Sequence, residues 1–259
     1  MPFKLHLELL VSNIVLGAFM FGGSEFYGPE RVMENEKLIL VTINYRLGIL
    51  GFMSTEDEVL PGNLGLKDQV AALQWVQRNI GAFNGDKNQV TIVGLSAGGA
   101  SVHLHYMSDL SNGLFKNGIS HSGVAINPWV MMENGREKAH MVGALVGCDF
   151  KNNHKKLLSC LKEIPVEKLV MTEMNFQPFF YNPFSPFGVS IENHHKNAFL
   201  TDHPQRILES GNFKKLPWIA SQVRDEGLYP GSEFFDADIL NEIDQNWLSL
   251  APHLLDFNG

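Results

Sequence analysis

Ser96 lies in a pentapeptide that can make its hydroxyl group a nucleophile. Residues 94–98 read Gly-Leu-Ser-Ala-Gly; residues 89–93 form a short β-branched segment typical of a buried strand, and residues 99–107 can continue as a helix. A strand, a sharp turn and a helix in this order lift a serine hydroxyl out at the top of an α/β sheet. An ordinary Gly-rich turn is the alternative, but the flanking elements favour the nucleophile, whose strained turn needs glycines.

Glu226 is the candidate for the acidic partner of such a serine. Ester hydrolysis by a serine also needs a general base, a group that orients the base, and an oxyanion hole. On this type of fold the three side chains run Ser, then Asp or Glu, then His along the chain. Residues 225–227 read Asp-Glu-Gly and follow a short apolar segment at 218–220. The alternative is a surface acidic pair at a turn, which is what Asp-Glu-Gly usually forms.

The remaining sequence alternates predicted strands and helices. Residues 37–43 and 117–123 indicate strands, and residues 67–80 indicate a helix with one apolar face. That face consists of Val70, Leu73, Val76 and Ile80. Further predicted elements are a turn at 84–86, a helix over 152–163, a loop over 175–186 and a helix from Pro204 to Gly211. This alternation predicts a mainly parallel α/β sheet.

Several segments, taken in order, resemble one known family. They are residues 44–52, 62–69, 72–80, 98–103, 225–227 and 251–256. The sequences of these segments resemble those of the type-B carboxylesterase/cholinesterase family, and most of all insect carboxylesterases. The resemblance extends over roughly residues 15–259. The resemblance implies an α/β-hydrolase fold, with a mainly parallel sheet flanked by helices and incomplete at both ends. It also implies a carboxylic ester hydrolase that acts on small-molecule esters through an acyl-enzyme, with no cofactor and no metal.

The resemblance assigns roles to individual residues. It implies that Ser96 is the nucleophile and that Glu226 is the carboxylate of the triad. The oxyanion hole needs backbone N–H groups aimed at the developing negative charge. The resemblance points to those of Gly17 and Ala18, together with that of Ala97, the residue after the nucleophile.

Two positions depart from the family pattern. The family reads His-Gly-Gly-Ala-Phe or similar at its oxyanion loop, whereas residues 15–19 here read Val-Leu-Gly-Ala-Phe. A Cβ at Leu16 could block the backbone conformation that aims the donors. Leu95 replaces the Glu that many relatives carry before the serine, which removes a carboxylate from the gorge.

Cys148 and Cys160 are the two cysteines of the chain. From the residues alone, two buried free thiols and a disulfide both remain possible. The resemblance implies a disulfide, because family members close a small loop at the matching position. A disulfide implies an oxidising compartment, so we expect a protein that is secreted or lies in the lumen of the secretory pathway.

The catalytic base is missing from this pattern. The chain has ten histidines, but the family's catalytic His lies much further beyond the acidic residue than residue 259. His253 is the only histidine after Glu226, and its segment resembles a non-catalytic part of the family. His103 and His105 lie on the predicted helix after the serine and are expected to be structural. A metal site is the alternative, but two residues that lie two positions apart on a helix do not share a face. We therefore expect this chain by itself to be nearly inactive.

Composition and the two ends limit the other possibilities. The 259 residues carry a formal net charge of −8 and no run of Lys or Arg, which argues against nucleic acid as a partner. No apolar run is long enough to suggest a membrane span. We expect residues 1–14 to be an atypical segment outside the family sequence, and residues 15–259 to be a partial catalytic domain. Because Glu8 interrupts the apolar start, we expect no credible signal peptide.

Two other functions fit the same resemblance. A catalytically dead cholinesterase-like domain used for adhesion or recognition would share the fold, and so would a pseudoenzyme. Ser96 and Glu226 both match catalytic positions, which favours an active enzyme. Five aromatic residues could line an apolar gorge or could equally be ordinary core: Trp129, Phe179, Phe180, Phe184 and Phe187.

Overall fold

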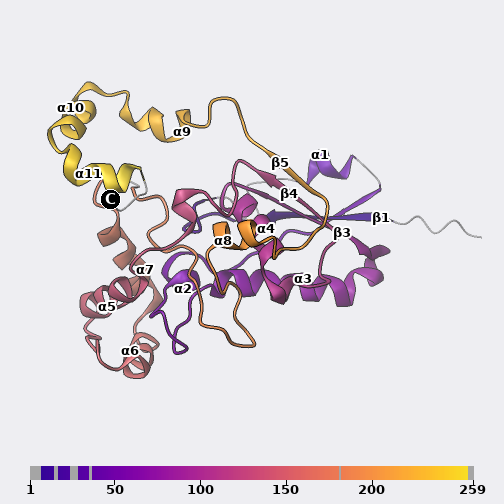
Figure 1. Cartoon of the computed structure of the whole chain (residues 1–259), viewed down its shortest axis with the longest axis horizontal. Coiled ribbons are helices and arrows are strands. Elements are labelled where there is room, and N and C mark those ends of the chain that lie inside the picture. Colours follow the sequence, from indigo (N-terminus) through magenta and orange to yellow (C-terminus); the bar gives the residue numbers. More distant parts are fainter. Residues whose placement is uncertain (1–6, 15–16, 24–28, 35–36, 181, 256–259) are drawn as a thin grey trace, which may run out of the picture.

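Five parallel strands form the central sheet, in the order β2-β1-β3-β4-β5 (Figure 1). The computed structural model describes residues 7–14, 17–23, 29–34, 37–180 and 182–255. The strands are β1 Leu7–Ile14, β2 Leu38–Leu40, β3 Gly85–Leu95, β4 Asn117–His121 and β5 Trp218–Ser221. Parallel neighbours need long crossover connections, which here contain the helices. The predicted α/β fold with a mainly parallel sheet is confirmed.

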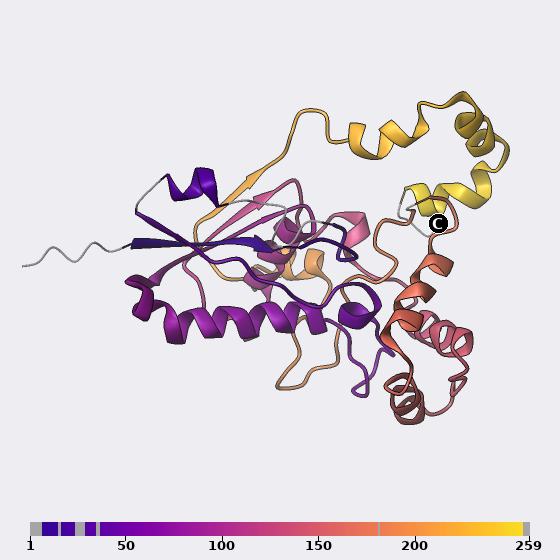
Figure 2. The same cartoon turned by 180° about the vertical axis from the view of Figure 1, so that it is seen from behind.

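Helices pack beside the sheet and extend beyond one end of it. They are α1 Glu30–Met33, α2 Gly48–Phe52, α3 Leu64–Asn79, α4 Ala97–Met107, α5 Gly135–Leu145, α6 His154–Leu161, α7 Val166–Met171, α8 Pro204–Ser210, α9 Leu228–Gly231, α10 Ala237–Gln245 and α11 Trp247–Leu254. In Figures 1 and 2, α3 runs along one side of the sheet. The predicted core face of this helix is confirmed, because all four of its apolar side chains are buried. Burying each contributes about 1.5–3 kcal/mol.

The register of the sheet brings four strand ends to one edge. Ile14 of β1 lies opposite Gly94 of β3, and Leu95 of β3 lies opposite His121 of β4. His121 in turn lies opposite Ser221 of β5. Because these strands are parallel, the segments that follow them all begin at the same edge of the sheet. This edge is where open α/β sheets place their ligands.

The first strand occupies the interior of the sheet. β1 pairs with β2 on one side and with β3 on the other, so it is hydrogen-bonded along both edges. It therefore gives structure to the second half of the segment 1–14, while residues 1–6 lie outside the described part. The boundary that we place at residue 14 stays a prediction.

Three predicted boundaries shift. The strand predicted over 37–43 is confined to β2, which pairs with β1 at three residues only. The helix predicted from residue 67 begins at Leu64, because Asn63 takes a left-handed conformation before it, with φ 56°. The turn predicted at 84–86 consists of Asn84 alone, with φ 63°, and β3 begins directly afterwards.

The predicted disulfide between Cys148 and Cys160 is confirmed. The bond joins the segment after α5 to α6, with a Cα–Cα distance of 5.7 Å and a sequence separation of 12. In the chain-entropy account, closing a loop of this length stabilises the fold by roughly 3 kcal/mol. The disulfide therefore holds α6 close to the end of α5.

His154, inside the disulfide loop, connects that loop to the rest of the fold. Its Nδ1 donates to the Asp57 carboxylate at 2.5 Å. Because a carboxylate only accepts, that nitrogen carries a proton, and the other ring nitrogen, Nε2, lies 2.9 Å from Nε2 of His140. Burial acting alone raises the pKa of Asp57, but hydrogen bonds from His154, Thr55 and two backbone amides lower it to about 2.

This carboxylate makes part of the stability depend on pH. A carboxyl group whose pKa is lowered by folding stabilises the fold above its ordinary pKa, and the contribution is lost as the pH falls towards the folded value. We expect Asp57→Asn to lower the urea midpoint at about pH 6, and the difference from the parent chain to shrink steadily from about pH 4 to pH 2. Urea titrations followed by tryptophan fluorescence at several pH values measure this. A difference that stays constant down to about pH 2 would contradict the assignment.

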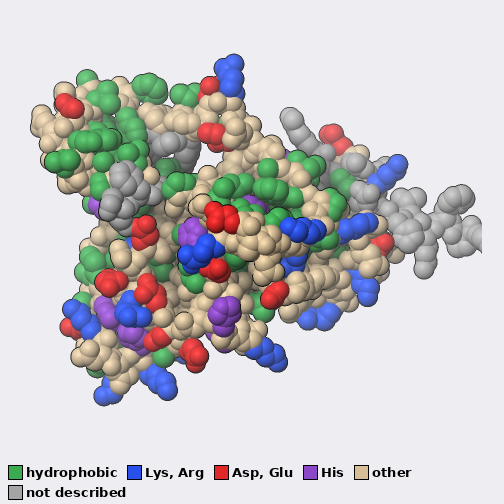
Figure 3. Space-filling view, viewed as in Figure 1, with side chains coloured by type: hydrophobic (Ala, Val, Ile, Leu, Met, Phe, Trp, Pro, Cys, Tyr) green, Lys and Arg blue, Asp and Glu red, His purple; other side chains and the backbone are tan. Residues whose placement is uncertain are grey.

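The last part of the described chain forms an arm that leaves the sheet after β5. Figures 1 and 2 show α9, α10 and α11 extending past the end of the sheet, with α11 returning towards α7. Apolar side chains gather on this arm in Figure 3. The exposed ones on β5 and the arm include Ile219, Val223, Leu228, Phe235, Leu240, Trp247 and Leu248. Exposed apolar side chains that gather in one region are typical of interaction sites.

Two features are absent from the described ranges. No helix there has the length and hydropathy needed to cross a bilayer. No group of three or more metal-ligating side chains comes together there either.

Candidate active site

Ser96 occupies a strained turn between β3 and α4. Its φ of 57° and ψ of −119° are unusual for a residue with a Cβ and cost about 1–3 kcal/mol. Two backbone hydrogen bonds hold the turn: Ser96 donates its N–H to the carbonyl of His121 at 2.8 Å, and its own carbonyl accepts from Ala100 at 2.9 Å. The predicted strand, turn and helix around the serine are all present.

Three glycines make this turn possible. A Cβ on Gly94 would overlap the backbone of Gly98, and a Cβ on Gly123 would overlap the backbone of Ser96 itself. A Cβ on Gly99 would come within 2.7–2.8 Å of two carbonyl oxygens. The neighbouring backbones therefore approach the serine closely on two sides, which fixes where its hydroxyl group can lie.

The loop after β1 takes an equally unusual conformation. Gly17, Ala18 and Phe19 have φ values of 123°, 52° and 61°, so two residues with a Cβ lie in the left-handed region. The Phe19 side chain is fully buried against Phe52, with ring centroids 4.9 Å apart. Conformations this costly persist only where surrounding contacts determine them, and they concentrate at functional sites.

Three successive carbonyl groups of this loop accept hydrogen bonds. The carbonyl of Gly17 accepts from two amides of its own turn, at 2.7 and 3.1 Å. The carbonyl of Ala18 accepts from the hydroxyl of Ser185 at 2.7 Å, and that of Phe19 accepts from the N–H of Gly48 at 2.6 Å. Because the carbonyl of one residue and the N–H of the next belong to the same peptide and point in opposite directions, these bonds orient the N–H groups of Ala18, Phe19 and Met20.

The backbone N–H groups predicted to form the oxyanion hole have no acceptor within the described ranges. Gly17, Ala18 and Ala97 are buried, and none of their N–H groups donates to another described residue. Buried N–H groups without an acceptor are rare in folded proteins. Ala97 opens α4, and the loop with the other two follows the strand next to β3. Residues 15–16, where we expected Leu16 to disturb this geometry, lie outside the described ranges.

Glu226 lies in the exposed loop after β5, at the same edge of the sheet but two strands away from β3. One of its carboxylate oxygens accepts from the N–H of Val223 at 3.0 Å, so it closes a turn of its own loop. In the described ranges no hydrogen bond joins Glu226 to Ser96, and the Ser96 hydroxyl has no partner. Ser96 and Glu226 thus lie at the same edge of the sheet, and no described side chain forms hydrogen bonds to both of them.

The two histidines on α4 are structural, as predicted. His103 stacks on Trp218 with ring centroids 4.3 Å apart, and burial lowers its pKa to about 4. His105 contacts Ser111 and Gln69 through its two ring nitrogens. Burial, aided by the nearby charge of Lys214, lowers the pKa of His105 to about 3. Both rings are therefore neutral parts of the core.

His121 is a site residue that the sequence did not single out. Its carbonyl supports the Ser96 turn, while its ring Nδ1 lies 2.6 Å from the hydroxyl of Ser221 on β5. This side-chain pair links β4, which lies next to the strand that leads to Ser96, to β5, which leads to Glu226. Only the pairing of β4 with β5 brings the two together.

A cavity of about 310 Å³ lies beside the loop that carries Ala18. Trp129 lines the cavity and packs on Phe19 at 6.1 Å between ring centroids; Ser185 lines it as well. The other four candidate aromatics do not line it: Phe179 and Phe187 are buried, Phe184 is half-buried and Phe180 is exposed. Of the five, Trp129 is thus the one placed to contact a ligand there.

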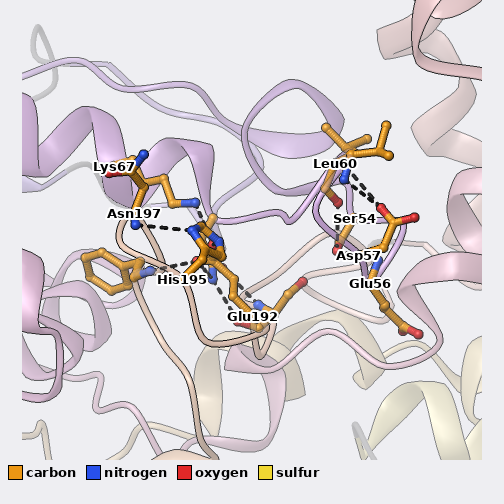
Figure 4. Close-up of polar contacts among 12 residues, drawn as sticks. Ser54, Glu56, Asp57, Leu60, Lys67, Glu192, His195 and Asn197 are labelled. Atoms are coloured by element: carbon orange, nitrogen blue, oxygen red, sulfur yellow. Dashed lines mark hydrogen bonds and ion pairs between the residues drawn. The ribbon is translucent and has the colours of Figure 1, made fainter. Parts of the chain in front are cut away.

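A buried carboxylate anchors the segment that supplies Ser185. Glu192 is fully enclosed, and one of its oxygens accepts from Asn63 Nδ2 at 2.8 Å and from the N–H of Phe199 at 2.9 Å. Its other oxygen pairs with Lys67 Nζ at 2.6 Å and lies 3.4 Å from Nε2 of His195 (Figure 4). These contacts join the start of α3 to residues 190–200.

Comparison with known proteins identifies the family of this chain. The carboxylesterase family matches residues 10–254, a range that starts inside β1. Venom carboxylesterase-6 of Apis mellifera is 46% identical over 244 residues, covering 93% of this chain and 43% of the relative. Esterase FE4 of Myzus persicae is 43% identical, covering 96% and 43%, and Esterase-5A of Drosophila pseudoobscura pseudoobscura is 41% identical, covering 95% and 46%. The chain spans less than half the length of these relatives, and it belongs to the carboxylesterase family.

Proposed function

We propose that this chain supplies the nucleophile, the oxyanion hole and the acidic residue of a serine carboxylesterase. Ser96 attacks the ester carbonyl, and the N–H groups of Gly17, Ala18 and Ala97 stabilise the oxyanion that forms. The alcohol leaves, and water then hydrolyses the acyl-enzyme. One observation carries this proposal: a serine held in a strained turn next to buried N–H groups that have no acceptor in the described ranges.

The base that activates Ser96 comes, in this proposal, from protein that completes the domain. In the described ranges no histidine ring forms a hydrogen bond to Ser96. The Glu226 carboxylate accepts a hydrogen bond from the N–H of Val223 in its own loop. The exposed apolar side chains of β5 and the arm support the idea that more protein packs there. An imidazole seated between Ser96 and Glu226 would complete the catalytic triad.

The substrate class follows from the cavity and from the relatives. The wall near Trp129 is apolar, so it suits the acyl or alcohol group of a small carboxylic ester. Relatives named as esterases and carboxylesterases support this class. The disulfide, and a relative named for venom, support a protein that passes through the secretory pathway.

The proposal is tested by completing the domain. Residues 1–254 are joined to the part of the honeybee relative that follows the matched region, and a p-nitrophenyl ester is added. We expect a burst of p-nitrophenol equal to the enzyme concentration, followed by steady turnover, because an acyl-enzyme accumulates. The chain of 259 residues alone is expected to give no turnover above background, since Ser96 without a base has the reactivity of an ordinary alcohol.

Two results would contradict the proposal. A completed protein that folds, as judged by circular dichroism, yet gives no burst and no turnover would favour the non-catalytic recognition domain. Turnover by the 259-residue chain alone, abolished by Ser96→Ala, would show that a base is already present in it.

A further inference from the structure

We propose that Ser185 is a positioning residue, whose hydroxyl holds the oxyanion loop in the orientation that catalysis needs. This inference rests on the proposed function. The Ser185 hydroxyl donates to the carbonyl of Ala18 at 2.7 Å, although 167 positions separate the two residues. It is the one side-chain donor to the backbone of Gly17, Ala18 and Phe19 among the described residues; the other donors are backbone amides.

The position of this bond in the loop makes it important. The carbonyl of Ala18 lies between the two residues whose φ values of 52° and 61° are unfavourable for side chains with a Cβ. The bonds on either side reach the carbonyls of Gly17 and Phe19 from the backbone, so a mutation cannot easily remove them. Without a donor at Ala18, a buried carbonyl would lack a partner, and the peptide would gain by rotating towards water.

The segment that carries Ser185 is itself firmly held. Val189 and Val130 form a backbone hydrogen bond of 2.8 Å, and Ser190 is bonded through both its N–H and its carbonyl to the side chain of Asn63. Glu192 lies two positions further along, in the buried network described above. The hydroxyl therefore acts from a fixed support, which is what a group that orients a catalytic loop requires.

Ser185 also touches the cavity beside the loop. Its side chain lines the same space as Trp129, and Trp129 packs on Phe19 of the loop. Ser185 thus belongs both to the wall that would contact the ester and to the contact that holds the peptide between Ala18 and Phe19, next to the proposed donors. A substitution there should change the rate of the chemical step more than the binding of the ground state.

The test compares Ser185→Ala with Ser190→Ala in the completed enzyme. Ser190 is an equally buried serine of the same segment, but its hydroxyl has no hydrogen-bond partner, so it is a matched control. We expect Ser185→Ala to lower kcat about 10- to 100-fold with KM nearly unchanged, somewhat less than the loss of a direct oxyanion donor. A trifluoromethyl ketone, which forms a tetrahedral adduct, should bind more weakly by a similar factor. Ser185→Thr, which keeps the hydroxyl, should recover most of the activity.

A second measurement uses the 259-residue chain itself. Amide hydrogen exchange at residues 17–22 should become faster in Ser185→Ala and stay unchanged in Ser190→Ala, because only the first variant releases the loop. Unchanged kcat and unchanged exchange in Ser185→Ala would overturn the inference. So would an equal loss in both variants, or a rise in KM with kcat unaffected. If the completed enzyme shows no turnover, the proposed function fails, and the exchange rates alone decide whether Ser185 holds the loop.

Discussion

Ser96→Ala in the completed enzyme is expected to lower kcat for a short-chain aryl ester by about 10⁴- to 10⁶-fold. In the proposed mechanism the oxygen of the Ser96 hydroxyl group forms the bond to the acyl group. The methyl group of Ala has no such oxygen and cannot form the acyl-enzyme. KM should change little, because the turn is fixed by backbone contacts to His121 and Ala100 and not by the side chain. Burst and steady-state assays with a p-nitrophenyl ester measure both constants.

Ser101→Ala provides the control for this experiment. Ser101 is a buried serine on α4, five positions after the nucleophile, and its hydroxyl accepts from Gln69 at 3.2 Å. It should retain kcat within a few-fold. An organophosphate should label Ser96 alone, and peptide mapping identifies the labelled residue. Comparable kcat in Ser96→Ala, or labelling of another serine, would refute the assignment.

Glu192→Gln is expected to lower the free energy of unfolding by about 3–5 kcal/mol, as when one partner of a buried ion pair is removed. The carboxylate is fully enclosed, whereas the side chain of Lys67 keeps 19% of its exposure, so the ammonium loses its partner in a largely buried place. The amide N–H group of the new Gln would also face Lys67 Nζ and Nε2 of His195, setting donors against each other. Urea unfolding followed by tryptophan fluorescence gives the difference.

The same chemical change at the surface provides the comparison. Asp202 pairs with Arg206 one turn along α8, with both side chains largely exposed. Asp202→Asn should leave the urea midpoint unchanged within error, because exposed ion pairs contribute little. If Glu192→Gln and Asp202→Asn lower the urea midpoint equally, burial does not explain the contribution of the Glu192 ion pair to stability.

Local signals were sufficient to predict the nucleophile turn. The glycines around Ser96, the β-branched residues before it and the small residues after it each specify their own backbone state, and all three agree with the structure. The apolar face of α3 could be read for the same reason, since a helical period repeats within one segment. The disulfide between Cys148 and Cys160 needed the family resemblance, because two cysteines alone do not indicate whether they are oxidised or free thiols.

Contacts between distant segments could not be predicted in this way. Ser185 lies in a stretch rich in Phe, Pro and Asn, and nothing near it in the sequence points to Ala18. The pairing of His121 with Ser221 depends on strand order, and a strand of four residues does not reveal its neighbour. Glu226 resembles the acidic position of the family in sequence, and in the described ranges its carboxylate accepts a hydrogen bond from its own loop, at the N–H of Val223.

The strand order also has a consequence for how the chain is made on the ribosome. All neighbours in the sheet are parallel, so no pair can form as a local hairpin, and β5 pairs with β4 although 97 positions separate Trp218 from His121 (218 − 121 = 97). At ordinary synthesis rates this gap takes about 5–20 s to translate. During that time the outer edge of β4 has no partner from β5, and its free N–H and C=O groups can pair with other chains. Binding of a chaperone at this edge during synthesis would therefore protect it from other chains until β5 arrives.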